Sequence, residues 1–357
     1  MKGYEKNMNK KLVNLIAITL IGASTISFVG CSNNSKKTDS NVNKSVASAE
    51  NKNNESKEVK DEKVEKKQYP LTIKDDSGRT VTLEKKPEKI AAISGTILGP
   101  LYAVGGESIA KADTKGGAPT PEGSKDLPTI GHVANIDVEK LIQLQPDLVL
   151  AQCGIHDRYK EVFEQNNIPY IMLEMKSYDD VVDKLQVLGN IVQNQDKSEE
   201  LIKTLKTKVE DITKKLPKEQ KKVAILYVTS KDVSLKLNSS IAGNSCEILN
   251  IKNIAEGEKP TKMGSDSTPF SMEKIVEQDP DMILVTTMVS SDEQAKETIK
   301  RELEGNPAWS GLKAVKEGKI EYLPQKYFLY NPGEKFYESI EYMAKAVYPE
   351  VYGNVEK

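Results

Sequence analysis

Two imidazole groups, His132 and His156, are the side chains of this chain best suited to ligate a transition metal. A neutral imidazole binds a metal through one ring nitrogen while a hydrogen bond at the other nitrogen orients the ring. Two histidines cannot supply the clustered ligands of a bare zinc or manganese site unless carboxylates complete it, so a free divalent metal is disfavoured. The chain also lacks a Gly-x-Ser-x-Gly elbow, a His-Glu-x-x-His motif and a convincing Ser-His-Asp constellation. The sequence therefore predicts a binding protein and not an enzyme.

A segment beside these histidines occurs twice and indicates which elements position them. Val138–Leu150, VEKLIQLQPDLVL, returns in the second half of the chain as Met272–Leu284, MEKIVEQDPDMIL. In each copy a helical pattern of apolar residues stops before a proline, and an apolar strand follows an aspartate. The long spacing between the copies suits a whole α/β lobe better than a solenoid repeat. The chain is therefore predicted to hold two similar lobes with a ligand cleft between them.

Alternating strands and helices predict an α/β fold with parallel sheets covered by helices. Two alternating strands around Asp-Ser-Gly predict a hairpin at Leu71–Leu83. The strand Ile90–Ile93 of lobe one corresponds to Lys222–Val228 of lobe two. Residues 178–216 contain no proline and a single glycine, which predicts two helices, the second long and charged on its outer face. The predicted boundaries are 69–194 for the N-terminal lobe, 195–217 for a linking helix and 218–357 for the C-terminal lobe.

The strand ends and the repeat offset predict which residues line the cleft. Residues just beyond the ends of parallel strands line the crevice of such sheets, which selects Ser94, Lys115 and His156. His132 lies in the loop that enters the repeated helix, and the offset between the two copies pairs it with Asp266 of the other lobe. We therefore expect His132 and Asp266 on facing walls.

The N-terminal part of the chain, up to about position 68, predicts an export signal followed by a tether. Residues 1–30 carry a basic start and an apolar run that Asn14 and several Ser and Thr interrupt, which is typical of a cleaved signal peptide; a single-pass anchor is the alternative. Phe28-Val29-Gly30-Cys31 resembles the lipobox of bacterial lipoproteins, so Cys31 is the predicted lipid anchor. Residues 31–68 are rich in Asn, Ser, Lys and Glu and predict a disordered tether. The expected location is the outer face of the cell membrane or a periplasm.

Charge and cysteine content limit the partners further. Residues 1–30 contain four Lys and one Glu, so their removal changes the formal charge from −2 to about −5, which disfavours nucleic acid as a partner. Cys153 and Cys246 fall in different lobes, where a bridge would lock the cleft. Both are therefore predicted to be free and buried.

The order of these motifs, together with Asn306–Trp309 and Tyr327–Gly333, resembles the substrate-binding proteins of ABC importers for iron complexes and cobalamin. The resemblance covers about residues 68–350. It implies two Rossmann-like lobes joined by one long backbone helix, with the ligand held between them. It also implies a monomer without an intrinsic cofactor, whose partners are a permease, its ATPase and the membrane that holds the lipid.

The resemblance also implies a docking surface. In that family a glutamate on each lobe meets an arginine of the permease, and Glu247 matches the lobe-two position. The matching glutamate of lobe one is absent around Gly99. Either Glu107 replaces it or the docking is asymmetric.

The implied cargo is an iron complex, either haem or a ferric siderophore, with cobalamin as an alternative and a surface receptor without transport as another. Some haem-binding members of the family carry a Tyr or His axial ligand at the position of His132, which makes His132 a candidate ligand of haem iron. A hydrogen bond to a siderophore and a solvent-facing loop position are the other interpretations. Met263 is the candidate for the second axial position, since a thioether can occupy it. Further candidates in the cleft are Tyr227, Met288, Tyr327 and Tyr330.

Overall fold

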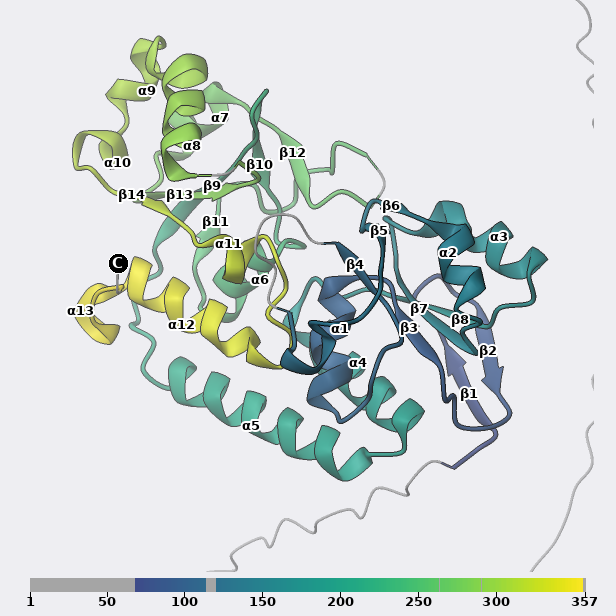
Figure 1. Ribbon diagram of the computed structural model, residues 1–357. Helices are drawn as coiled ribbons and strands as arrows, with labels where there is room; N and C mark the ends of the chain where they lie inside the picture. Colours follow the sequence, from purple (N-terminus) through teal and green to yellow (C-terminus); the bar gives the residue numbers. More distant parts are fainter. Residues whose placement is uncertain (1–67, 114–119, 263, 290, 356–357) are drawn as a thin grey trace, which may run out of the picture. The chain divides into compact units, whose positions relative to one another are not determined.

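The computed structural model describes residues 68–113, 120–262, 264–289 and 291–355 (Figure 1). They form an α/β fold with parallel sheets, which confirms the predicted fold class. Within these ranges, no helix combines the length and the apolar character needed to cross a bilayer. Several predictions lie outside the described residues: the signal peptide, nearly all of the tether, the lipid anchor Cys31, and the cleft candidates Lys115 and Met263.

Lobe one is built around the parallel sheet β3-β7-β8. The near-continuous burial of β7 is what a central parallel strand covered on both faces requires. The predicted hairpin is confirmed, with Leu71 opposite Leu83, and a further sheet, β4-β5-β6, carries the segment around His132. The strands are β1 (Leu71–Lys74), β2 (Thr80–Leu83), β3 (Ile90–Ala92), β4 (Lys111–Asp113), β5 (Thr129–His132), β6 (Asn135–Ile136), β7 (Leu148–Gln152) and β8 (Tyr170–Leu173).

Lobe two holds a six-stranded sheet whose centre is parallel. Strand β13 pairs in parallel with β9 on one side and with β14 on the other, whereas β10 and β12 extend the sheet by antiparallel pairing. The short β11 pairs in parallel with β9. The strands are β9 (Lys222–Val228), β10 (Val233–Lys236), β11 (Lys252–Asn253), β12 (Ser267–Pro269), β13 (Met282–Thr287) and β14 (Ile320–Tyr322).

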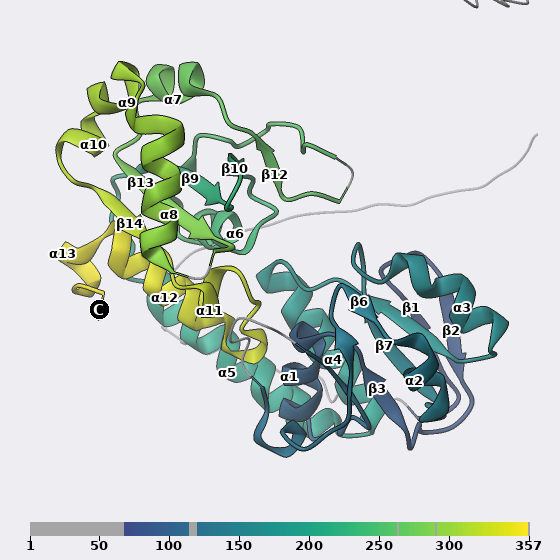
Figure 2. The ribbon, with the colours of Figure 1, turned by 45° about the horizontal axis from the view of Figure 1, so that its top comes forward.

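Helices cover the sheets and connect the lobes (Figure 2). The predicted helical pair between the lobes is present as α4 and α5, which pack on each other, and α5 also packs on α12. A capping box of Ser177 and Asp180 starts α4. The helices of lobe one and the connection are α1 (Gly95–Ala103), α2 (Val138–Gln143), α3 (Lys160–Gln165), α4 (Tyr178–Val192) and α5 (Gln195–Thr213). Those that follow are α6 (Ile241–Ile248), α7 (Met272–Gln278), α8 (Asp292–Ile299), α9 (Pro307–Gly311), α10 (Lys313–Lys316), α11 (Gln325–Phe328), α12 (Phe336–Val347) and α13 (Pro349–Tyr352). Short 3-10 turns lie at η1 (Glu122–Ser124), η2 (Asp157–Tyr159) and η4 (Gly333–Lys335), and a π turn at η3 (Lys300–Glu304).

The repeated segment has the same construction in both lobes, which confirms the predicted helix–turn–strand unit. In each copy a residue in the left-handed conformation, Gln145 (φ 51°) or Asp279 (φ 39°), turns the chain into the Pro-Asp dipeptide. Asp147 then accepts a hydrogen bond from the backbone N–H of Lys89, at 2.9 Å, and Asp281 accepts one from the N–H that opens β9, also at 2.9 Å. The repeated aspartate therefore fixes the start of the strand that pairs beside its own.

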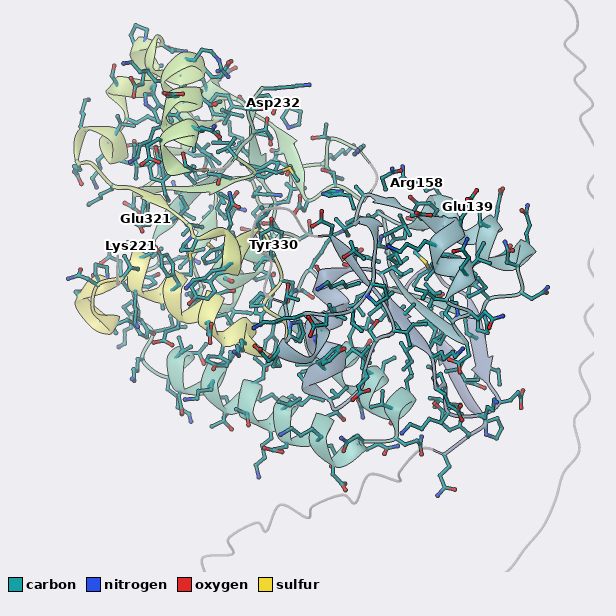
Figure 3. The ribbon with its side chains drawn as sticks, viewed as in Figure 1. Glu139, Arg158, Lys221, Asp232, Glu321 and Tyr330 are labelled. Atoms are coloured by element: carbon teal, nitrogen blue, oxygen red, sulfur yellow. The ribbon has the colours of Figure 1, made fainter. Side chains whose placement is uncertain are left out.

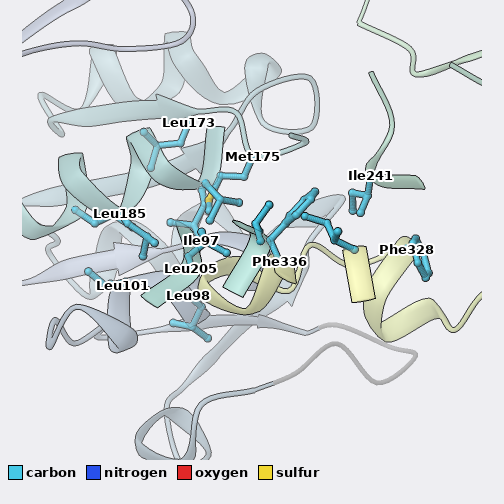
Figure 4. Packing of buried hydrophobic residues seen from close by; sticks show 14 of the residues in the cluster. Ile97, Leu98, Leu101, Leu173, Met175, Leu185, Leu205, Ile241, Phe328 and Phe336 are labelled. Atoms are coloured by element: carbon cyan, nitrogen blue, oxygen red, sulfur yellow. The ribbon is translucent and has the colours of Figure 1, made fainter. Parts of the chain in front are cut away.

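One hydrophobic cluster joins elements of both lobes (Figure 4). It includes Ile97 of α1, Leu205 of α5 and Phe336 of α12, all without solvent exposure. Removing a buried aromatic ring of this kind costs about 3–5 kcal/mol. The Asn331 side-chain amide also donates to the Met175 carbonyl oxygen at 2.7 Å, which ties the segment before α12 to lobe one. The lobes are thus held together by α5, α12 and this segment.

Candidate functional site

A cavity of about 1020 Å³ lies between the lobes. It is located at the carboxyl ends of β3, β7 and β13, which is where open α/β sheets bind ligands. Its volume is large for a small-molecule site and suits a macrocycle or a bulky chelate better than a single ion. From lobe one the lining includes Ser94, Tyr102, Glu122, His132, Gln152 and Ile155. From lobe two and the C-terminal segment it includes Met288, Gln325, Lys326, Tyr327, Tyr330 and Glu334.

Ser94 connects two loops at the lobe-one wall of the cavity. Its hydroxyl oxygen caps α1 by accepting a hydrogen bond from the Thr96 N–H at 3.3 Å. The same hydroxyl donates to the Gln152 side-chain oxygen at 2.6 Å. Because the Gln152 oxygen is used in this way, its amide nitrogen is left as the hydrogen-bond donor for a ligand.

His132 is held at the cavity by the short β5–β6 hairpin. Gly131 before it has a φ of +86°, and a side chain there would come within 2.8 Å of the Asn135 carbonyl oxygen, so the position requires glycine. The His132 Nδ1 accepts a hydrogen bond from the Ala134 N–H at 3.2 Å. The neutral ring therefore carries its proton on Nε2, and Nε2 can ligate a metal only after that proton has moved to Nδ1 and the hydrogen bond from Ala134 has been given up.

Met288 lines the cavity from lobe two, directly after β13, and is 64% exposed. The Tyr227 hydroxyl donates to the Met288 sulfur at 3.1 Å. Burial raises the pKa of Tyr227 to about 12, so this hydroxyl keeps its proton at neutral pH. Tyr227 itself does not line the cavity; it lies behind Met288, with the Lys236 ammonium 4.0 Å from its ring centroid. An exposed thioether with one hydrogen bond retains a lone pair for a soft metal ion.

The remaining wall combines aromatic rings with charges of both signs. Tyr327 and Tyr330 line it, and the Lys326 ammonium is 4.5 Å from the Tyr327 ring centroid. Figure 3 labels Tyr330, which belongs to the segment between α11 and η4. Lys335 adds a second positive charge, and burial raises the pKa of the Glu334 carboxyl. The lining therefore offers positive charge to an anionic group.

His156, which the sequence assigns to the cleft, is fully buried and does not line the cavity. Its Nδ1 accepts a hydrogen bond from the Gln152 N–H at 2.9 Å, so Nε2 carries the proton and donates to the Val133 carbonyl oxygen at 2.8 Å. Burial lowers the pKa of His156 to about 4. A neutral ring with both nitrogens engaged has no position left for a ligand.

The other predicted residues lie away from the cavity. The Asp266 carboxylate accepts a hydrogen bond from the Lys236 ammonium at 2.7 Å and is absent from the lining. Cys153 and Cys246 are both free; Cys246 is buried as predicted, whereas Cys153 is only half-buried, and burial raises its pKa to about 12. Glu247 is exposed on α6, and its docking role stays a prediction. Among the described residues no cluster of three or more His, Cys, Asp or Glu side chains could hold a bare metal ion.

Several lining residues were not singled out from the sequence. Gln152 ends the strand of the first repeat and Ile155 lies just beyond it, so the strand-end rule that selected Ser94 could have found them. Gln325 and Lys326 lie on the short helix α11, where Gln325 donates to the Thr287 hydroxyl at 3.0 Å. No local pattern marks α11 as a cavity wall, because its position depends on tertiary packing.

Comparisons with known proteins agree with this geometry. Residues 90–327 match the model of the family described as periplasmic binding protein. The uncharacterized ABC transporter substrate-binding lipoprotein YvrC of Bacillus subtilis is 26% identical over 304 residues, 82% of this chain and 91% of that protein. The Fe(3+)-citrate-binding protein YfmC of the same organism is 25% identical over 256 residues, covering 70% and 76%. The crystal structure of Staphylococcus aureus IsdE complexed with heme shares the fold, with a TM-score of 0.64, 20% identity, and coverage of 73% of this chain and 98% of that one.

Proposed function

The chain belongs to the periplasmic binding protein family, and on this premise we propose that it is the lipid-anchored substrate-binding protein of an ABC importer, which captures an iron complex outside the cell and delivers it to a membrane permease. Three findings support this proposal: the cavity between two lobes, the similarity to an ABC transporter substrate-binding lipoprotein, and the similarity to an Fe(3+)-citrate-binding protein. The role requires binding and release, and no catalytic group.

Among iron complexes, we propose haem as the cargo. The observation that carries this choice is that His132 and Met288, one from each lobe, line the same cavity, so one site holds an imidazole and a thioether. Imidazole and thioether are both established axial ligands of haem iron. A ferric siderophore already saturates its iron with its own oxygen atoms and would have no use for such a pair.

The rest of the lining is compatible with this cargo. Ile155, 36% exposed, and the Tyr327 and Tyr330 rings offer apolar contacts for a macrocycle. Lys326 and Lys335 offer positive charge for the two propionates. The exposed apolar side chains Ile155 and Met288 would lose their contact with water when the ligand binds, which favours binding.

A ligand panel tests the proposal. The protein is titrated with haemin, ferric citrate, a ferric catecholate and cyanocobalamin, and binding is followed by the Soret band and by Trp309 fluorescence. We expect tight binding of haemin and weaker binding of the others. Tight binding of a siderophore or of the corrinoid with no haemin binding would exclude haem while leaving the importer role intact.

Anchoring and delivery need their own test. Cys31→Ser should release the protein from the membrane into the medium, whereas Cys153→Ser should leave it attached. Retention of the Cys31→Ser protein on the membrane would contradict lipid anchoring at that residue. Loss of haemin uptake in cells that produce only the released protein would support delivery to a permease.

A further inference from the structure

Two glutamines, Gln152 and Gln325, line the cavity from opposite lobes. Gln152 is the last residue of β7 in lobe one, and Gln325 is the first residue of α11, which follows the lobe-two sheet. A side-chain amide has an oxygen that accepts hydrogen bonds and an NH2 group that donates two. The end of the amide that serves a ligand is therefore the end that the protein itself leaves unused.

In Gln152 the protein engages the amide oxygen. The Ser94 hydroxyl oxygen accepts the Thr96 N–H, and the Ser94 hydroxyl hydrogen donates to the Gln152 oxygen at 2.6 Å. The backbone of Gln152 is also held, because its N–H donates to His156 Nδ1 at 2.9 Å and its strand position pairs with Leu173. Lobe one therefore presents the NH2 group of Gln152 to the cavity from a fixed position.

In Gln325 the protein engages the amide nitrogen instead. The Gln325 NH2 group donates to the Thr287 hydroxyl at 3.0 Å and also to the Val289 carbonyl oxygen. Both amide hydrogens are then in use, which leaves the Gln325 oxygen for a ligand. An anionic oxygen is attracted by the donor of lobe one and repelled by the acceptor of lobe two.

The surroundings of Gln152 favour a negative charge over a neutral acceptor. Ser94, its partner, caps the N-terminus of α1, where the partial positive charge of the helix favours an anion. The acidic side chains of the lining belong to other elements: Glu122 to η1, Glu334 to η4 and Glu338 to α12. A hydrogen bond to a carboxylate is roughly twice as strong as one to a neutral oxygen.

We propose that Gln152 is a specificity-determining residue that donates a hydrogen bond to a carboxylate of the cargo, so that the acidic edge of the cargo lies against lobe one. The inference rests on the proposed function, in which the cargo is haem and the carboxylate is one of its two propionates. The second propionate is left for Lys326 or Lys335 of the same lining. The site therefore selects the free acid over a neutral ester of the same macrocycle.

Soret titrations of the full-length chain in mild detergent test this selection with haemin and haemin dimethyl ester, in which both propionates are neutral. Gln152→Met removes the donor and keeps an unbranched side chain of similar length. It should weaken haemin binding about tenfold and ester binding only about threefold, because a neutral acceptor forms the weaker bond. Gln152→Glu should weaken haemin binding more than Gln152→Met does, since two carboxylates repel, and this additional loss should be absent for the ester.

Two further variants serve as controls. Gln165→Met changes an exposed glutamine of α3 outside the cavity and should leave both affinities unchanged. Gln325→Met removes the acceptor of the facing wall and should not lower the ratio of haemin to ester affinity. Equal losses for both compounds in Gln152→Met, or an unchanged ratio, would overturn the role of Gln152 while haem remains the cargo. If the wild-type protein binds neither compound, the haem assignment fails and the propionate contact fails with it.

Discussion

His156 makes the stability of lobe one depend on pH, and the lowering of its pKa in the folded state allows the size of the effect to be estimated. The folded ring is neutral, with a pKa lowered by burial to about 4, whereas the ordinary pKa is 6.5. The unfolded chain therefore takes up the proton first as the pH falls. The contribution of His156 is complete above pH 6.5 and is lost progressively towards pH 4. The difference in pKa corresponds to about 3 kcal/mol of unfolding free energy.

The assay compares urea unfolding of the wild-type protein and of His156→Gln at several pH values between 7 and 4. His156→Gln replaces the ring that bonds the Gln152 N–H and the Val133 carbonyl oxygen, so the variant should be less stable than the wild type at pH 7. The glutamine side chain does not titrate, so it contributes no pH dependence of its own. We expect the difference between the two proteins to shrink by about 3 kcal/mol across this range. Carbon-bound imidazole protons give a direct check, because the chain has only two histidines and His132→Ala leaves the signal of His156 alone. A constant difference in stability, or a His156 signal that titrates near 6.5, would refute the reasoning.

Three further predictions concern the cavity. Tyr227→Phe removes the hydrogen bond to the Met288 sulfur and should weaken haemin binding by roughly 2- to 5-fold in a Soret titration, with unchanged thermal stability. Burial raises the pKa of the Glu334 carboxyl, so its negative charge is lost on acidification and the affinity for an anionic ligand should increase. Glu334→Gln removes this charge, so it should strengthen the binding of an anionic ligand at neutral pH and make the affinity less dependent on pH. Isothermal titration at pH 5 and pH 7 measures both effects. Gly131→Ala places a side chain at positive φ against a backbone oxygen, so it should lower the free energy of unfolding in urea by about 1–3 kcal/mol. Gly154 also has a positive φ but has open space around it, so Gly154→Ala should lower the free energy of unfolding by less. Stabilities that do not differ between the two glycine variants would contradict the argument from the close contact.

Much of the fold could be predicted because it is encoded locally. The helix, the stop at Pro and the Asp-led strand of the repeat depend on neighbouring residues, so Val138–Leu150 and Met272–Leu284 could be assigned from their pattern alone. The same holds for the hairpin at Leu71–Leu83 and for the strand Lys222–Val228, whose bounds match β9. The antiparallel additions β10 and β12 could not be foreseen, since their pairing depends on contacts distant in sequence.

The site was less accessible to sequence reasoning. The offset between the two repeat copies identifies equivalent loops in the two lobes. The prediction that His132 and Asp266 face each other also requires that equivalent loops approach the cavity in the same way. In lobe two the loop before β12 instead packs along β10, where Asp266 pairs with Lys236, while Met288 at the end of β13 reaches the lining. For His156 the prediction failed because a residue beyond a strand end can be buried and not face the cavity. Its burial and its two hydrogen bonds come from the packing of the turn at η2 against a separate hairpin, which the local sequence does not indicate.

The central claim is that His132 and Met288 ligate one haem iron from opposite lobes. Near-infrared magnetic circular dichroism of the haemin complex tests it most directly, since it distinguishes His–Met ligation from other axial pairs. We expect a His–Met spectrum for the wild-type protein, loss of the thioether signature in Met288→Leu, which preserves side-chain volume, and loss of the imidazole signature in His132→Ala. A wild-type spectrum of a different ligand pair, or one that neither substitution changes, would contradict the account.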